Sequence, residues 1–342
     1  MKIKSISQVA RRMNIRDPFI LASNIYDKYP EGNGNMAPKS YLAGRQIGSD
    51  FSETAPWRMY HGNKVPGFPQ HPHRGFEIVT IVPEGLVDHF DSKGSKGRYG
   101  NGDVQLMSAG RGAMHSEMFP LLNDDKENSL RLFQIWINLP AKNKLTEADY
   151  KMLWAENIPV ANLDCPSGGH VRIKVILGEY YGVKALGALK NSWAADPKNH
   201  LGIALIEMDA NTEFKLENIS STMNRFILYY EGDQDISIEG TAISQNHMVD
   251  VAGDQEIVIK SGDSSAKILL LEGEPINEPI AAYGPFVMNT EQELVDAFEE
   301  YRRTEFGGWP WGEKESDIIN DKNAERFASY QFGKIIDKPQ MT

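Results

Sequence analysis

Two short segments of the sequence carry side chains that can bind a metal ion. The segment HPHRGFE (71–77) places His71 and His73 two residues apart, and the segment MHSEM (114–118) gives His115 and Glu117 the same spacing. In a β-strand, residues i and i+2 point to the same face. If the two strands lie on facing walls of one small barrel, three imidazoles and one carboxylate converge, a ligand set that suits Fe, Mn, Co, Ni, Cu or Zn.

This ligand set is typical of a catalytic metal site. Four protein ligands leave one or two positions of an octahedral shell open, whereas structural sites close their shell. Calcium and magnesium prefer shells of oxygen ligands, and a single cysteine, Cys165, cannot build a thiolate zinc site. One His-x-His pair alone is weak evidence, because most such histidines are surface or core residues. Here three of the chain's eight histidines fall in the two segments, which strengthens the prediction.

Two further titratable residues lie near these segments. Glu77 has the same strand parity as His71 and His73, and it could be a ligand, a solvated carboxylate or a partner that orients an imidazole. We favour the orienting role, which is common around metal sites. His89 lies next to Asp88 in a candidate strand, and we expect it to make a hydrogen bond there rather than to bind the metal.

The elements that must position these residues are predicted to be β-strands. From residue 17 onward, short apolar runs alternate with Gly, Pro, Asn and Asp at the spacing of an all-β sandwich or barrel. A first block has candidate strands at 76–82, 85–92, 103–109, 113–119 and 130–139. A second block has candidate strands at 171–177, 200–208, 225–232, 235–240, 256–261 and 266–273. Two blocks of similar size and spacing predict a duplicated architecture.

Helical patterns are expected outside the two blocks. Residues 1–15 are expected to form a short arm with one or two helical turns. Residues 141–160 show helix-like apolar spacing and are a candidate linker. Residues 291–306 form an amphipathic pattern, and Thr290 with Glu293 could supply a capping box at its start.

Composition restricts the class of protein. A chain of 342 residues is long enough for two domains, and 41% hydrophobic with 24% charged residues is typical of a soluble globular protein. The net charge of −11 argues against non-specific nucleic-acid binding, although simple solubility also explains it. The first 18 residues contain no apolar stretch of signal-peptide length, and no run is long enough to span a bilayer. We therefore expect a cytoplasmic protein with no membrane contact.

The motifs around these residues resemble those of the pirin family of the cupin superfamily. The resemblance extends from about Asp17 to about Phe298. It is carried by RDPF (16–19), HPHRGFEIVTIVPEG (71–85), NGDVQLMSAGRGAMHSEM (101–118), LFQIWINLP (132–140), LEGEPINEPI (271–280) and YGPFVMNT (283–290). The chain departs from the family pattern at Leu106 and Ser108, where we expect an effect on the pocket mouth.

The resemblance implies an all-β fold of two tandem double-stranded β-helix (cupin) barrels packed together, with a helical C-terminal tail. It implies an arm at 1–15, a metal-binding domain at 16–145, a cupin domain without metal ligands at 146–290 and an extension at 291–342. The family's single metal, usually iron, would be held by His71, His73, His115 and Glu117. Family members are commonly monomeric, and we expect the same here.

Some pirins cleave the flavonol quercetin with dioxygen, and others act as transcriptional co-regulators. Our first hypothesis is therefore a metal-dependent dioxygenase that acts on a small aromatic substrate. In it, the metal would act as a Lewis acid, Glu117 would be the general base, and Phe76 and Met114 would line the pocket. The alternative is a metal-containing regulatory protein or redox sensor without turnover, with a protein partner rather than nucleic acid. The sequence contains no dinucleotide-binding or phosphate-loop motif, so we expect no organic cofactor.

Overall fold

The chain folds mainly as β-strands in a computed structural model that describes residues 1–40, 42–166, 168–313 and 317–340. Its contacts divide it into two compact units. One unit, called here the first barrel, comprises residues 23–156 and 278–342. The other, called the second barrel, comprises residues 1–22 and 157–277. Each unit takes its residues from two separate stretches of the chain.

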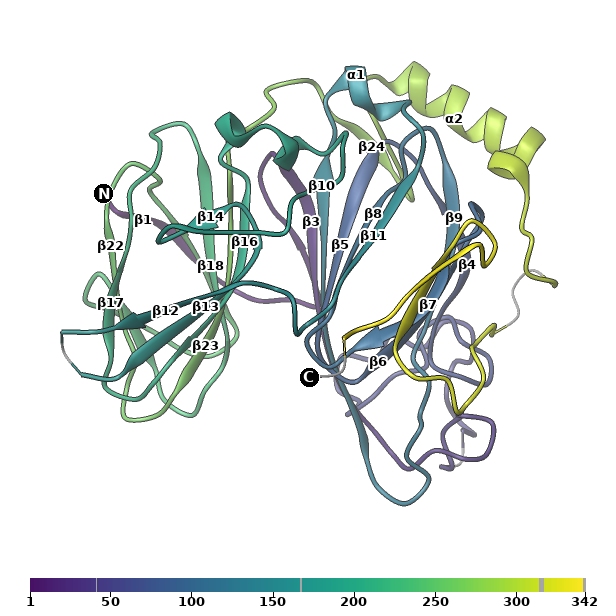
Figure 1. Ribbon diagram of the computed structural model, residues 1–342, viewed down its shortest axis with the longest axis horizontal. Coiled ribbons are helices and arrows are strands. Elements are labelled where there is room, and N and C mark those ends of the chain that lie inside the picture. Colours follow the sequence, from purple (N-terminus) through teal and green to yellow (C-terminus); the bar gives the residue numbers. More distant parts are fainter. Residues whose placement is uncertain (41, 167, 314–316, 341–342) are drawn as a thin grey trace. The chain divides into compact units, whose positions relative to one another are not determined.

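Two antiparallel sheets form the walls of the first barrel (Figure 1). One sheet has the order β11-β8-β5-β10-β3-β2, with β2 (Arg12–Asn14) at its end, and the other has the order β27-β26-β7-β6-β9-β4. The strands of the first wall are β3 (Phe19–Tyr29), β5 (Phe76–Glu84), β8 (Val104–Ser108), β10 (Asn128–Asn138) and β11 (Asp149–Leu153). The strands of the second wall are β4 (Gly67–His73), β6 (Leu86–Asp91), β7 (Lys96–Gly100), β9 (Ala113–Met118), β26 (Phe327–Tyr330) and β27 (Ile335–Asp337).

The second barrel repeats this arrangement with different side chains. Its larger sheet has the order β1-β21-β18-β23-β16-β13-β12, and its smaller sheet has the order β17-β22-β19-β20. The larger sheet contains β1 (Ile3–Gln8), β12 (Val160–Asp164), β13 (His170–Leu177), β16 (Gly202–Met208), β18 (Asn224–Glu231), β21 (His247–Val251) and β23 (Ala266–Gly273). The smaller sheet contains β17 (Glu213–Leu216), β19 (Ile236–Ile238), β20 (Thr241–Ile243) and β22 (Ile257–Lys260). Aliphatic residues from both sheets meet in one buried core.

Short elements complete the two units. The remaining strands are the hairpin β14 (Glu179–Tyr180) with β15 (Val183–Lys184), and the hairpin β24 (Ala281–Tyr283) with β25 (Phe286–Met288). The helices are α1 (Ala141–Lys144), α2 (Glu291–Thr304), η1 (Trp193–Ala195), η2 (Pro197–Asn199) and η3 (Glu305–Gly307). Within the described ranges, none of these helices is long and apolar enough to cross a membrane.

The helix expected after residue 290 is present and is capped as predicted. The Thr290 side chain accepts a hydrogen bond from the Glu293 backbone N–H, and the Glu293 carboxylate accepts one from the Thr290 N–H. The reciprocal pair satisfies two backbone donors at the start of α2. Beyond the short helix η3, the extension contributes strand β26, which pairs with β7 and makes this segment part of the first barrel.

Two other predicted helical segments are wrong. The expected N-terminal helical arm is strand β1, which pairs with β21 of the second barrel. The middle of the expected linker is strand β11, which pairs with β8, and only α1 at its start is helical. Tyr150 and Met152, two residues apart in β11, both pack into one core of the first barrel, as a two-residue period requires. The predicted domain boundaries therefore differ from the two compact units at both ends of the chain.

The C-terminal segment is anchored to the first barrel by a buried ion pair. Arg98 donates from Nε and Nη2 to the two carboxylate oxygens of Asp88, at 2.7 and 2.8 Å. Its Nη1 donates to the backbone carbonyls of Asp321 and Ala324, at 3.0 and 2.9 Å. Asp88 also accepts from the backbone N–H of Asn320. The Arg98–Asp88 pair thus makes hydrogen bonds with backbone carbonyls and a backbone N–H of the segment that precedes β26.

Candidate metal centre

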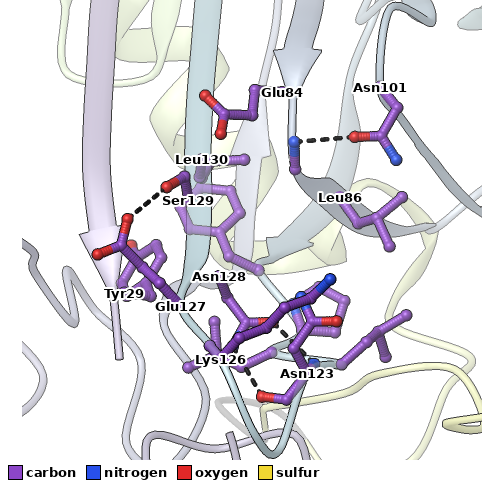
Figure 2. Close-up of a pocket in the computed structure, with 15 residues that line it drawn as sticks. Tyr29, Glu84, Leu86, Asn101, Asn123, Lys126, Glu127, Asn128, Ser129 and Leu130 are labelled. Carbon is purple, nitrogen blue, oxygen red and sulfur yellow. Dashed lines mark hydrogen bonds between the residues drawn. The ribbon is translucent and has the colours of Figure 1, made fainter. Parts of the chain in front are cut away.

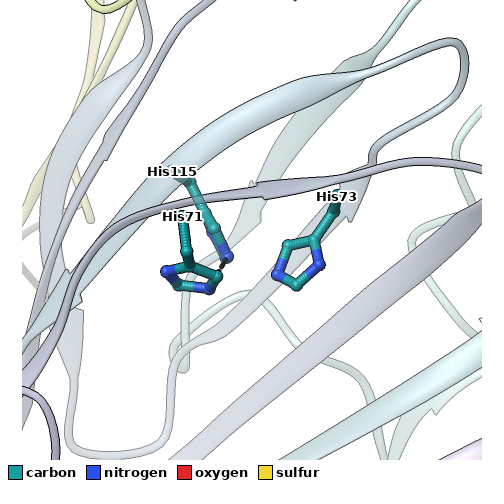
Figure 3. A group of neighbouring side chains, drawn as sticks. All are labelled: His71, His73 and His115. Carbon is teal, nitrogen blue, oxygen red and sulfur yellow. Dashed lines mark hydrogen bonds between the residues drawn. The ribbon is translucent and has the colours of Figure 1, made fainter. Parts of the chain in front are cut away.

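Three histidines from two neighbouring strands converge inside the first barrel. Strands β4 and β9 are antiparallel, and His71 lies directly opposite His115. His73 projects from the same face of β4, so all three rings meet (Figure 3). One ligand nitrogen from each histidine lies within 4.8 Å of the other two. The predicted same-face spacing does bring these three imidazoles together, but the expected placement on facing walls is wrong, because β4 and β9 are neighbours in one sheet.

Backbone carbonyls fix which ring nitrogen of His71 and of His73 is available to bind a metal. The carbonyl of Pro69 lies 2.9 Å from Nδ1 of His71, and the carbonyl of Pro285 lies 3.3 Å from Nδ1 of His73. A carbonyl can only accept, so each Nδ1 carries the proton and each Nε2 presents a lone pair. Orienting contacts of this kind are common at metal-binding histidines.

The free lone pairs fit a metal ion. Nε2 of His71 and Nε2 of His115 are 3.0 Å apart, which is about the separation of two adjacent ligands each about 2.1 Å from a metal. Nε2 of His73 is buried and has no hydrogen-bond partner among the residues that the structure describes. A buried polar atom without a partner costs free energy unless a ligand satisfies it. The three residues therefore suit a divalent transition metal.

Burial keeps the imidazoles neutral, as metal binding requires. Desolvation lowers the pKa of His71 to about 4. It also holds the pKa values of His73 and His115 well below their ordinary range, and the neighbouring imidazoles lower both pKa values further. Protons therefore compete weakly with a metal at this cluster.

Glu117 lies beside the histidines but is held by other side chains. Its Oε2 is 3.8 Å from Nε2 of His115, and both oxygens accept from Nε2 of Gln134, at 3.0 and 2.8 Å. Thr80 adds a longer contact of 3.4 Å. Burial raises the pKa of Glu117, whereas the Gln134 hydrogen bond opposes that shift. Glu117 is thus close enough to His115 for both side chains to bind one metal ion, and the Gln134 amide orients its carboxylate.

Glu77 does not lie on the face of the histidines, contrary to the expectation from strand parity. Strand β4 ends at His73, the chain turns at Gly75, and β5 begins at Phe76. Gly75 has φ of 85°, and a Cβ there would lie 1.9 Å from the Val287 carbonyl oxygen, so this turn requires glycine. Because the turn separates two strands, the parity counted from His73 does not continue to Glu77.

The inward face of β5 is defined by other residues. Phe76 contacts the His73 ring, with centroids 5.2 Å apart, and Thr80 reaches Glu117. Glu77 lies on the opposite face of β5 and pairs with Ser108 of β8. Ser108 and Leu106 therefore also face away from the metal cluster, and the departures from the family pattern at these positions do not reshape its pocket.

The two expected wall residues have different positions. Phe76 is on the inner face, where it stacks on Trp136 with ring centroids 4.2 Å apart. Met114 is buried but has the opposite parity to His115 on β9, and its sulfur accepts from Gln70 at 2.8 Å. The prediction for Met114 is wrong because adjacent residues of a strand face opposite sides.

Trp136 was not predicted and belongs to the site. Its ring lies 5.3 Å from that of His73, and its Nε1–H donates to Oε1 of Gln134 at 3.1 Å. This contact fixes the orientation of the Gln134 amide, which then donates from Nε2 to Glu117. The sequence could have indicated this role, because Gln134 and Trp136 are two residues apart in a predicted strand and so share one face.

His89 was expected to make a hydrogen bond within its strand. It does so with Asp91 at 3.3 Å, whereas Asp88 faces the other side and pairs with Arg98. His89 is fully buried, lies opposite Glu117 on the paired strand β9, and has its ring 5.6 Å from that of His115. It therefore forms part of the surroundings of the histidine cluster, which the sequence reading did not anticipate.

A separate cavity of about 420 Å³ lies away from the cluster (Figure 2). Its polar groups mainly stabilise the loops around it. Asn101 accepts from the Gly85 N–H, Ser129 donates to Glu127, and Asn128 donates to the Asn123 carbonyl. None of the predicted site residues lines it.

The second barrel has apolar side chains at the corresponding strand positions. Its strands β17 and β22 pair as β4 and β9 do, with Phe214 opposite Ile259 and Leu216 opposite Ile257. All four side chains are buried in the aliphatic core. The described part of these two strands therefore offers no imidazole or carboxylate to the interior.

Comparisons with known proteins agree with this architecture. Residues 4–137 match the Pirin family model, and residues 203–307 match the model of the Pirin C-terminal cupin domain. Pirin-1 of Arabidopsis thaliana is 39% identical over 246 residues, which cover 70% of this chain and 78% of the relative. A Pseudomonas aeruginosa protein provisionally named quercetin 2,3-dioxygenase is 36% identical over 244 residues, covering 70% of this chain and 79% of that protein.

A solved structure shows the same fold. The crystal structure of quercetin 2,3-dioxygenase from Acinetobacter baumannii superposes with a TM-score of 0.69 at 25% identity, covering 90% of this chain and 98% of that one. The match extends over both barrels, and the all-β cupin fold expected from the sequence is confirmed. On the strength of these matches, the chain belongs to the pirin family.

Proposed function

We propose that this protein is a metal-dependent dioxygenase that cleaves an enol-containing aromatic molecule, a flavonol such as quercetin, with dioxygen. The observation that carries the proposal is the convergence of three neutral imidazoles beside a buried carboxylate in the first barrel. The relatives named as quercetin 2,3-dioxygenases support the reaction class.

The proposed ligands are His71, His73, His115 and Glu117, and the proposed metal is Fe(II). Nitrogen and oxygen ligands of this kind also accept Ni, Co, Cu, Mn and Zn. Once bound, the metal would supply Lewis acidity that favours the deprotonated form of a substrate hydroxyl. His71 and His73 contribute preorganisation, because Pro69 and Pro285 already hold their Nε2 lone pairs toward the cluster.

Glu117 is the proposed general base. Burial raises the pKa of its carboxyl, and a carboxylate with a raised pKa is a stronger base for a substrate hydroxyl. Gln134 keeps the carboxylate in place through hydrogen bonds to both oxygens. The proton of the substrate hydroxyl would pass to Glu117, after which the electron-rich enolate reacts with dioxygen.

The aromatic side chains beside His73 suit a flat substrate. Phe76 and Trp136 stack on each other with an interplanar angle of 29°, and both rings contact His73 edge-on. Trp136 remains 9% exposed, whereas Phe76 is fully buried. We expect Trp136 to present its edge to the substrate and to exclude water from the carboxylate behind it.

Dioxygen consumption tests the proposal directly. The Fe(II)-loaded protein is mixed with quercetin in an oxygen-electrode cell, beside a His71→Ala, His115→Ala double variant. A matched control is the His170→Ala, His247→Ala variant, which removes two imidazoles from the second barrel. We expect uptake in the parent and in the control, and uptake at least about 100-fold slower in the first variant.

Two other results would each have a clear meaning. If the parent binds one metal per chain but consumes no dioxygen with quercetin, flavonol cleavage is wrong for this protein, and a metal-dependent regulatory role gains support. If the double variant retains full uptake, the reaction takes place elsewhere, and the assignment of the three histidines is wrong.

A further inference from the structure

The second barrel contains a buried ion pair in an otherwise aliphatic interior. Arg225 of β18 and Glu272 of β23 lie directly opposite each other, and Arg225 Nε donates to Glu272 Oε2 at 2.6 Å. Their side chains are 0% and 2% exposed. The neighbouring inward residues of the same strands, Ile227 and Leu270, belong to the hydrophobic core. A purely structural barrel gains little from such a pair, because desolvating both charges offsets their attraction.

This pair is incompletely satisfied within the part of the chain that the structure describes. Nη1 and Nη2 of Arg225 are buried and have no hydrogen-bond partner there. A guanidinium has five N–H donors, and fully buried arginines normally use most of them. The ion pair is therefore not a completed structural network.

Glu272 also lines a cavity of about 660 Å³ within the second barrel unit. The cavity reaches Glu272 because residue 202 is a glycine: a Cβ there would lie 2.2 Å from the Tyr180 hydroxyl and 3.2 Å from Cγ of Glu272. Tyr180, itself buried, shares the cavity wall. One carboxylate and one phenol thus meet at the polar end of this cavity.

The rest of the wall indicates what kind of molecule fits. Most of the remaining lining is apolar, with Leu177, Leu189, Leu201 and Ile219 contributing. The charged side chains that line the cavity carry both signs, so they give no preference for a charged ligand. They are Glu179, Lys184, Lys190, Asp196 and Glu272.

We propose that the cavity of the second barrel binds a small neutral molecule with an apolar body and one hydroxyl group, whose O–H donates to Glu272. An ionised carboxylate accepts but cannot donate, so the ligand must supply the proton. Arg225 holds Glu272 in place through its Nε–H and is not itself among the residues that line the cavity. This site is separate from the histidine cluster and does not depend on the dioxygenase assignment.

The probe for the test is 2-naphthol, an aromatic bicycle with one hydroxyl. It is titrated by fluorescence into the metal-free His71→Ala, His115→Ala protein, so that the histidine cluster cannot contribute. The comparison ligand is 2-methoxynaphthalene, which has the same rings but no donor. We expect saturable binding of 2-naphthol and about tenfold weaker binding of the methoxy compound, the difference that one hydrogen bond to a charged group produces.

A cavity-filling variant locates the binding. Ala188 lines the cavity and is partly exposed, so Ala188→Trp fills space without disturbing Glu272 or the core. We expect it to weaken 2-naphthol binding at least tenfold while circular dichroism stays unchanged. As a check that needs no variant, nuclear Overhauser effects should connect the naphthol ring to the methyl groups of Leu189 and Ile219.

Three results would overturn the proposal. They are no saturable binding of 2-naphthol, equal affinity for the methoxy compound, or Overhauser contacts only to residues outside the cavity. Failure of quercetin turnover at the histidine cluster has no bearing on it, since the probe is measured on a protein that lacks that cluster.

Discussion

The side-chain amide of Gln134 donates hydrogen bonds to both carboxylate oxygens of Glu117, at 3.0 and 2.8 Å. The same amide accepts from Trp136 Nε1–H, so its orientation is fixed. The proposed base is thus oriented by a partly buried side chain of β10, a strand of the opposite wall. This relationship leads to the first prediction.

Replacing Gln134 by Leu should shift the pH dependence of turnover. The hydrogen bonds from Gln134 favour the charged carboxylate, so their loss raises the pKa of Glu117 further. The acid limb of the kcat profile should move to higher pH, and kcat at pH 6 should fall by about tenfold. Metal content, measured by plasma emission, should stay at the parent level. A Gln245→Leu variant, altered in the second barrel, should leave the profile unchanged.

Removing one histidine of the cluster should weaken metal binding strongly. His73→Ala deletes one of three converging nitrogens, and we expect at least about 100-fold lower affinity in a competition titration with a chelator. His61→Ala makes the same chemical change at an exposed position of the first barrel. Equal losses in the two variants would show that the metal is not held by the predicted cluster.

The metal-free protein should lose stability as the pH falls from about 6.5 toward 4. Folding lowers the pKa of His71 from 6.5 to about 4, so in this window the unfolded chain binds a proton that the folded chain does not. Stability is therefore fully present above pH 6.5 and decreases below it, by at most about 3 kcal/mol from this residue because its ring is partly exposed. Urea unfolding at pH 7.0, 5.5 and 4.5 measures the loss.

The same measurement has an internal control. His71→Gln removes the titrating group, so its stability should depend less on pH across the window than that of the parent. A parent whose stability stays flat between pH 7.0 and 4.5 would contradict the lowered pKa.

Breaking the buried Arg98–Asp88 pair should destabilise the first barrel. Arg98→Met leaves Asp88 buried without its cation and removes donors to the carbonyls before β26. We expect a loss of about 3–5 kcal/mol in unfolding free energy, followed by tryptophan fluorescence during urea denaturation. Arg111→Ala breaks an exposed pair with Glu147 in the same unit and should cost less than about 1 kcal/mol.

Much of the histidine cluster could be predicted from strand periodicity alone. His71 and His73 follow a two-residue period within β4, and that period survives folding because the strand is regular at these residues, whereas His115 joins them through the pairing of β9 with β4. Glu77 could not be placed by the same rule, because the turn at Gly75 ends one strand and begins another. Met114 was expected in the pocket, but it lies next to His115 in β9 and therefore faces the other side of the strand.

Contacts between distant segments were less predictable. The spacing of Leu145, Tyr150, Leu153 and Trp154 suggested a helix, yet pairing with β8 makes this segment a strand. His89 gained its position near the cluster only when β6 paired with β9. Local periodicity describes one strand, whereas pairing across the barrel decides which side chains meet.

The pairing of β26 with β7 has a consequence for the order of events during synthesis. The three histidines leave the ribosome long before residues 327–330, which complete the same sheet. Until then, β7 presents an open edge on the wall that carries His71, His73 and His115. This sheet therefore reaches its full strand order only at the last stage of translation or after release, although the strands that carry the histidines are synthesised much earlier.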